Sequence, residues 1–183
     1  MTATDDLKHE HKIILVIMDA VDREARSIQA TGKVNAATLD KMVDFCRVFI
    51  DRCHHGKEEE YLFPKLEEKG VAREQGPLGV MLQEHEAGRQ RVKAIAASLP
   101  QAGAGDPQTV AALAANLEAY SALLRAHIDK ENNVLFPMAD RLFSPVEQQT
   151  LVQAFAKHEA EEIGPGVHEK YHQLAHELTE DKA

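Results

Sequence analysis

The sequence predicts an all-α protein, an antiparallel up-and-down four-helix bundle with a C-terminal helical extension. Helix-favouring residues dominate the chain of 183 residues, while aromatic residues make up 5% of it and tryptophan is absent. Apolar side chains recur at helical spacing in four long segments with short connections, which is the pattern of a bundle. The chain also repeats itself, because the stretch Cys53–Pro64 returns as Ala126–Pro137 with six identities in twelve positions.

The first expected helix covers residues 5–29, and Thr4 or Asp5 can cap its N-terminus. An apolar stripe at seven-residue spacing runs along this helix, and His11 lies in the stripe. Gly32 is expected to end the helix, because glycine readily adopts the left-handed conformation found there.

The second expected helix begins at Asn35 or Thr38 and carries His54 and Glu58. These two side chains are four residues apart, so on a helix they lie on the same face. Pro64 is expected to kink or end this helix, because proline lacks an amide donor and its ring meets the preceding turn.

The third expected helix covers residues 77–99 and carries His85 in its apolar stripe. The proline- and glycine-rich residues 100–107 predict a loop. The fourth helix is expected over residues 108–137, where His127 and Glu131 repeat the spacing of the second helix.

The C-terminal extension is predicted to contain two more helices. Ser144 can form a capping box at the start of a helix that continues to Ile163, and residues 168–178 are amphipathic after a glycine-proline break. We therefore expect a bundle over residues 1–143 and an extension over residues 144–183 that packs on the same domain.

Composition excludes several classes of function. A formal charge of −9 without a Lys/Arg block argues against nucleic-acid binding, and no apolar run is long enough to span a membrane. Cys46 and Cys53 lie about two turns apart on one expected helix, too far to form a disulfide. Free thiols and the absence of a signal-peptide pattern predict a cytoplasmic protein.

The histidines and glutamates of the two halves form matching sets. One lone histidine in an apolar stripe is usually a core residue, but several buried ionisable groups together are costly without a metal. Two sets, each of two imidazoles and one carboxylate, suit a pair of first-row ions such as iron or manganese better than magnesium, calcium or a thiolate-bound zinc. The predicted ligands are His11, His54 and Glu58 from one half and His85, His127 and Glu131 from the other.

Coordination counting predicts reactivity if the metal is iron. Two six-coordinate irons offer about twelve positions, of which four histidines and two bridging glutamates fill about eight. An oxo or hydroxo bridge takes two more. About two positions then remain for other ligands or a small molecule, which favours redox or gas chemistry over a closed structural site.

These motifs resemble the hemerythrin-like HHE cation-binding family over about residues 5–143. The resemblance implies a four-helix bundle around a non-haem di-iron centre, in a family whose members bind or sense dioxygen, handle peroxide or nitric oxide, or take part in iron homeostasis. The residues that carry it are Glu10-His11, His54-His55-x-Lys57-Glu58-Glu59 with Leu62-Phe63-Pro64, Glu84-His85, and His127-x-x-x-Glu131 with Leu135-Phe136-Pro137.

One departure concerns the third helix. In the oxygen-carrying hemerythrins this helix carries two histidines four apart, whereas the residues four before and four after His85 are Met81 and Arg89. The loss of one imidazole disfavours reversible oxygen carriage and leaves one ion more open.

His55 and Tyr61 are the two candidates to act at the open position. His55 can lean towards the site, and Tyr61 has no tyrosine counterpart in the second half, where Val134 stands in its place. The alternatives are a surface histidine and a core tyrosine. Glu59 and Glu60 are expected to face solvent.

The extension adds a histidine cluster whose role stays open. A second metal site, a surface or packing role, a cap over the bundle end, and a contact in a homodimer are all compatible with its spacing. The cluster consists of His158, His168, His172 and His176.

The leading prediction is a di-iron protein that reacts with small oxidants, either by decomposing peroxide as a catalase- or peroxidase-like enzyme or by handling dioxygen or nitric oxide. The alternative is a non-catalytic module that senses oxygen or iron. A metal-free helical interaction protein is a third possibility, disfavoured by the buried histidine set.

Overall fold

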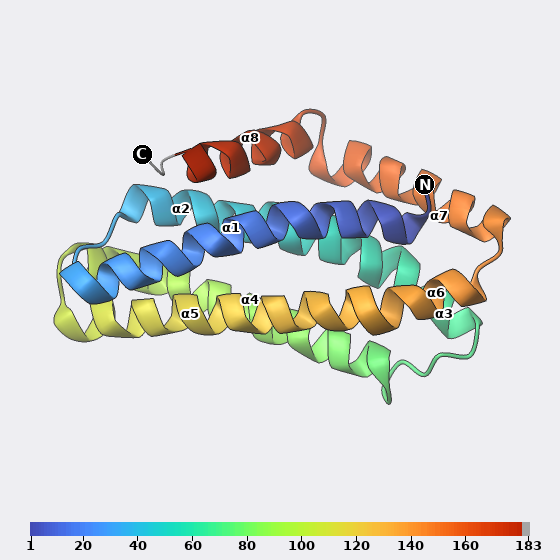
Figure 1. Cartoon of the computed structure of the whole chain (residues 1–183), viewed down its shortest axis with the longest axis horizontal. Coiled ribbons are helices and arrows are strands. Elements are labelled where there is room, and N and C mark those ends of the chain that lie inside the picture. The colour runs from blue at the N-terminus through green and yellow to red at the C-terminus, as the bar shows by residue number, and fades with distance from the viewer. Residues whose placement is uncertain (181–183) are drawn as a thin grey trace.

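The computed structural model describes residues 1–180 and confirms the all-α prediction (Figure 1). The long helical segments of the bundle run side by side and alternate in direction, and the shorter C-terminal helices lie along one side of them. The bundle consists of α1 (Ala3–Thr31), α2 (Ala36–Phe45) continued through η1 (Cys46–His55), η2 (Glu58–Leu62) and α3 (Phe63–Glu68), α4 (Pro77–Gly103), and α5 (Pro107–Lys130) continued through η3 (Glu131–Leu135) and α6 (Phe136–Leu142). The side pair is α7 (Pro145–His158), continued by η4 (Glu159–Ile163), and α8 (Val167–Glu180).

The start of α1 differs from the prediction. Thr2, rather than Thr4 or Asp5, is the N-cap: its hydroxyl accepts from the Asp5 amide, and the Asp5 carboxylate accepts from the Thr2 amide. Thr4 is buried instead, and its hydroxyl donates to Asp140 of α6. Gly32 ends the helix at a φ of 67°, as predicted.

Single π-helical turns precede the two prolines of the repeat. The Phe63 amide donates to the Glu58 carbonyl and the Phe136 amide to the Glu131 carbonyl, five residues back in each case. This wider turn carries the preceding carbonyls away from the proline rings. The helices therefore do not end at Pro64 or Pro137 but continue to Glu68 and Leu142.

The predicted loop over residues 100–107 is too long. Helix α4 continues through Pro100 to Gly103, and Asp106 already caps α5 by accepting from the Thr109 amide at 2.8 Å. Pro100 removes one amide donor near the end of α4, and the burial of Leu99 and Ala102 favours the continued helix.

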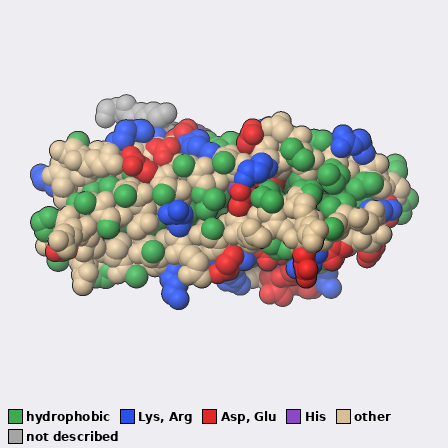
Figure 2. Space-filling view, turned by 90° about the horizontal axis from the view of Figure 1, so that it is seen from below, with side chains coloured by type: hydrophobic (Ala, Val, Ile, Leu, Met, Phe, Trp, Pro, Cys, Tyr) green, Lys and Arg blue, Asp and Glu red, His purple; other side chains and the backbone are tan. Residues whose placement is uncertain are grey.

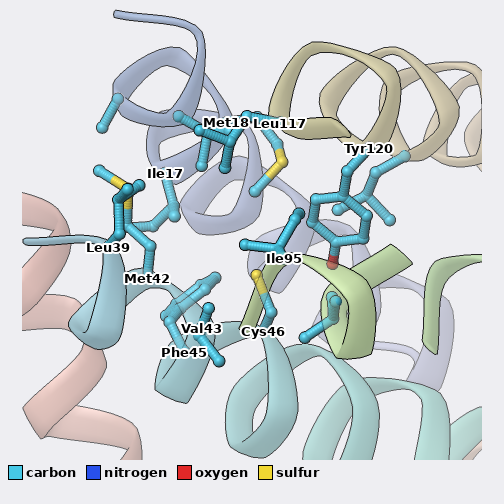
Figure 3. Close-up of a cluster of buried hydrophobic side chains, with 14 of the residues drawn as sticks. Ile17, Met18, Leu39, Met42, Val43, Phe45, Cys46, Ile95, Leu117 and Tyr120 are labelled. Carbon is cyan, nitrogen blue, oxygen red and sulfur yellow. The ribbon is translucent and has the colours of Figure 1, made fainter. Parts of the chain in front are cut away.

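Two apolar clusters fill the bundle on either side of a buried polar layer. The larger joins residues of α1, α2, η1, α4, α5 and α8, and Figure 3 shows part of it, from Ile17 and Met18 to Leu117 and Tyr120. The smaller joins the start of α1 with residues such as Phe63, Leu78 and Phe136. The histidines and glutamates between these clusters lie in a low-dielectric interior, which strengthens every charge interaction there.

The C-terminal helices pack on the bundle. Tyr171 of α8 lies against Phe45 and Phe49, with ring centroids 5.4 and 5.8 Å apart, and its hydroxyl donates to Asp44 at 2.9 Å. Phe155 of α7 belongs to the smaller cluster. A boundary between residues 143 and 144 stays a prediction, since both helices share the bundle's core.

The surface carries no broad basic area on the face seen in Figure 2, where Lys and Arg side chains are scattered. This agrees with the net charge of −9. Within residues 1–180, none of the helices combines the length and the apolar character needed to cross a membrane.

Candidate metal centre

The polar layer brings all six predicted ligands together, and His55 joins them. Each of the seven residues is at most 5% exposed. They form two adjacent groups, and within each group the ligand atoms lie within 4.8 Å of one another. The first group contains His11, His54, Glu58 and Glu131, and the second contains His55, Glu58, His85 and His127.

The two glutamates connect the groups. Glu58 places Oε1 3.7 Å from His54 Nε2 and Oε2 3.4 Å from His85 Nε2. Glu131 places Oε2 3.2 Å from His11 Nε2 and Oε1 3.2 Å from His127 Nε2. Each carboxylate therefore turns one oxygen to each group, which is the arrangement of a bridging ligand. None of these four buried oxygens has a hydrogen-bond partner.

The outer nitrogen of each histidine is held by an oxygen. His54 Nδ1 lies 2.9 Å from Glu10, and His127 Nδ1 lies 3.0 Å from Glu84. In the same way, Asn132 holds His11 at 2.9 Å and Glu59 holds His85 at 2.7 Å. A carboxylate or amide oxygen can only accept, so Nδ1 carries a proton, and Nε2 is the nitrogen whose lone pair can be offered inwards to a cation.

These inward lone pairs fit a cation. His11 Nε2 and His54 Nε2 are 3.0 Å apart, and His85 Nε2 and His127 Nε2 are 3.1 Å apart. Two nitrogens about 2.1 Å from one ion and at a right angle to each other are about 3.0 Å apart. The donor set of imidazoles and unbonded carboxylate oxygens therefore matches a metal ion in each group.

Without a cation, protons must balance the buried carboxylates. Burial alone lowers the pKa of His85, but the nearby carboxylate of Glu58 and the hydrogen bond to Glu59 outweigh burial and raise this pKa to about 9. Burial raises the pKa of Glu131, but the neighbouring His127 and His11 bring it well below its usual range. A metal ion would take the place of these protons.

Comparison with known proteins identifies the family. A family model, the hemerythrin HHE cation-binding domain, matches residues 2–139. The chain belongs to this family. As an HHE domain, it is a metal-binding protein, and the two buried groups are where its bundle gathers metal-ligating side chains.

Several curated proteins resemble this HHE domain. Uncharacterised proteins of Mycobacterium bovis and Mycobacterium tuberculosis are 29% identical over 164 residues, which cover 90% of this chain and 64% of theirs. The iron-sulfur cluster repair protein YtfE of Edwardsiella ictaluri is 36% identical over 114 residues, or 60% of this chain and 50% of that protein. The chain thus spans less than two thirds of the length of these relatives. No solved structure matches it.

His55 of the HHE domain is buried rather than on the helix surface. Its ring stacks on His85 with centroids 3.7 Å apart, and neither ring nitrogen has a hydrogen bond. The π-helical turns of η1 explain this placement, because a wider turn lets His54 and His55 both face the interior. Burial, followed by the neighbouring charges of His85 and His127, holds the pKa of His55 well below its ordinary value.

Tyr61 takes a different place from the one predicted. Its half-buried ring turns towards α7, with centroids 6.3 Å from Phe155 and 5.7 Å from His158. The π-helical turn η2 changes the direction of side chains that follow Glu58, which a regular helix would not do. Of the two candidates for the open position, His55 therefore lies in the metal-ligand groups and Tyr61 lies against the extension.

Sequence reasoning missed the outer residues Glu10, Glu59, Glu84 and Asn132. The pairs Glu10-His11 and Glu84-His85 are visible in the sequence, but each glutamate holds a histidine on another helix. Glu59 was expected to face solvent. It is 26% exposed in the side chain and accepts from both His85 and Arg89.

A third group of possible ligands already contains a cation. Glu10, Cys53 and Glu159 lie within 4.8 Å of one another. The ammonium of Lys57, with no exposed side-chain surface, lies 2.8 Å from Glu10 and 2.9 Å from Glu159. Lys57 therefore occupies this group and joins η4 of the extension to the outer partner of His54.

The histidine cluster of the extension does not form a metal group in the described residues. His158 is buried and its Nε2 donates to the Arg52 carbonyl at 2.9 Å. The ring of His172 stacks near His9, and His176 is exposed. The side chain of His168 lies outside the described residues. Packing is the observed role of His158.

Proposed function

We propose that the HHE domain holds two iron ions and reacts with small oxidants, namely hydrogen peroxide, dioxygen or nitric oxide. His11 and His54 would hold one ion, His85 and His127 the other, and Glu58 and Glu131 would bridge them. The observation that carries the proposal is the pair of buried carboxylates whose four unbonded oxygens each face an imidazole Nε2. The resemblance to an iron-sulfur cluster repair protein supports iron over other first-row metals.

When bound, an oxo- or hydroxo-bridged iron pair supplies redox chemistry towards such oxidants. The chain's own residues set the conditions for that chemistry. The two apolar clusters exclude bulk water, and the outer partners fix the four ligating rings. His55 has no hydrogen-bonded partner, so the unprotonated nitrogen of its neutral ring can accept a proton from an incoming molecule and later return it.

We propose an enzymatic role of the peroxidase or catalase kind, in the cytoplasm. Both cysteines are free and buried, which suits a reducing compartment. Homodimer formation stays a prediction. The site opens on a cavity that His55 lines, so a substrate can approach the second group from that side.

Metal analysis of the full chain purified with iron tests the metal centre. We expect about two irons per chain. Glu58→Ala and Glu131→Ala should each lose most of this iron, because each removes an oxygen from both groups. Glu60→Ala is the matched control, since its carboxylate is 59% exposed on the same helix. Full iron content in both bridging variants would refute the proposed centre.

A second candidate function is an oxygen- or iron-sensing module. The contacts Glu159–Lys57–Glu10–His54 favour it, because they join the extension to a ligand of the first group. Adding peroxide distinguishes the two functions. Oxygen release that is abolished by His127→Ala supports the enzyme. Proteolysis near residues 164–166 that depends on iron or oxygen, without breakdown of peroxide, supports the sensor.

A further inference from the structure

A cavity of about 400 Å³ opens beside the second ligand group. His55, His85 and His127 line its inner end, and apolar side chains of three helices form its walls. The walls include Ile50 of η1, Val92 of α4 and Leu124 of α5. The hydroxyl of Tyr120 and the thiol of Cys46 also line the cavity, and Figure 3 shows these two side chains turned towards each other.

The cavity is much larger than the small oxidants need. One water molecule takes about 30 Å³ in the liquid, and a diatomic gas or hydrogen peroxide is of similar size. The volume is instead that of sites for small organic molecules, which are mostly apolar with a few placed polar groups. His55 supplies such a polar group, because it is 5% exposed and neither nitrogen has a hydrogen bond, although Nδ1 lies 3.7 Å from Asp51.

Two cations at the rim have no ion pair in the described part of the chain. Arg47 and Lys93 line both this cavity and the shallower groove beside it, and both are exposed. Several nearby charges are already paired: Arg89 contacts Asp51 and Glu59, Glu84 contacts Lys130, and Asp44 in the groove contacts Lys170. Asp40 also lines the groove, but it does not line the cavity. In a chain with a net charge of −9, this unpaired positive rim marks a site for an anion.

We propose that the cavity binds an organic anion of about ten heavy atoms, a carboxylate with an apolar body. Its carboxylate would lie at Arg47 and Lys93, its body along Ile50, Val92 and Leu124, and its far end at His55. The binding site stands on these contacts alone. Contact between the metal pair and the end of the anion at His55 rests on the proposed function. The substrates of that function would then include organic molecules of this class.

Calorimetric titration of the iron-loaded full chain with octanoate tests the site, with acetate and 1-octanol as probes that lack the body or the charge. We expect one octanoate per chain, bound at least tenfold more tightly than either probe. The double variant Arg47→Ala/Lys93→Ala should weaken octanoate about tenfold, because it removes two partly screened charge contacts. The matched control Arg26→Ala/Lys33→Ala removes two exposed cations that do not line the cavity, and should change nothing.

A filling variant provides the second test. Leu123→Trp adds a large side chain at a half-buried wall position, so it should abolish octanoate binding without disturbing the fold. Binding that is insensitive to both the rim and the filling variants, or no saturable binding to iron-replete protein, would overturn the proposal. Iron content is measured in the same samples. Octanoate binding to a chain that takes up no iron would uphold the cavity site and refute the di-iron function instead.

Discussion

Replacing Lys57 with methionine should destabilise the metal-free protein by about 3–5 kcal/mol, because it leaves the buried carboxylate of Glu10 without its cation. The Lys57 side chain is 0% exposed, and its ammonium lies 2.8 Å from Glu10, 2.9 Å from Glu159 and 3.2 Å from Asp6. It also lies 5.4 Å from the ring centroid of Phe155. Methionine has a similar unbranched shape, so the substitution removes the charge and keeps most of the packing.

The internal repeat provides a matched control. Lys130 occupies the equivalent position in the second half, where its ammonium contacts Glu84 as that of Lys57 contacts Glu10. The Lys130 side chain is 40% exposed and the Glu84 side chain 19%, so water solvates the charges that remain after substitution. Lys130→Met should therefore cost less than about 1 kcal/mol.

Guanidinium unfolding of the metal-free proteins at one pH, followed by circular dichroism, measures both changes. The expected result is a lower midpoint for Lys57→Met with an unchanged slope, and a midpoint for Lys130→Met close to that of the parent. Equal losses in the two variants, or a Lys57→Met protein as stable as the parent, would show that burial of Lys57 does not control its contribution.

Three further predictions concern the centre. Glu10→Ala should weaken iron binding about 10- to 100-fold, because His54 loses the partner that fixes its ring. Competition with a chelator measures the affinity, and an unchanged value would contradict the prediction. Folding raises the pKa of His85 to about 9, so protonated His85 stabilises the metal-free protein by about 3 kcal/mol below about pH 6.5. This stabilisation should disappear as the pH rises through 9. His85→Gln should therefore flatten this part of the plot of unfolding free energy against pH. His55→Ala should keep iron bound but slow the reaction with peroxide, measured by stopped-flow absorbance, and an unchanged rate would remove His55 from the proposed chemistry.

Helical periodicity and repetition made the fold predictable, and also the burial of the candidate ligands in one layer. A period of 3.6 places His54 and Glu58 on one face, and the second copy of the motif predicts the same for His127 and Glu131. All of these side chains are buried in the polar layer. Such local spacing needs no knowledge of other helices, so a single sequence is enough.

Features that depend on distant segments were not predictable in the same way. The π-helical turns turn His55 inwards and Tyr61 towards α7, yet the sequence around them reads as an ordinary helix. Lys57 is buried because Phe155 and Glu159, about a hundred residues later, cover it. These side-chain positions depend on packing between distant helices, and the local sequence pattern does not predict such packing.

The repeat also shows where the two metal positions differ. Glu59 and Asn132 are equivalent in the two copies of the motif, and each holds the histidine of the opposite half, His85 and His11 respectively. A carboxylate partner makes an imidazole a stronger donor than a neutral amide does. The second group therefore has carboxylate partners on both His85 and His127, whereas the first has an amide on His11 and a carboxylate on His54. A cation contacts each of these carboxylates, so the difference between the groups is the amide of Asn132. The more electron-rich group is the one that His55 and the cavity adjoin, so the asymmetry of the outer residues and the direction of access would both favour reaction at the second of the two proposed ions.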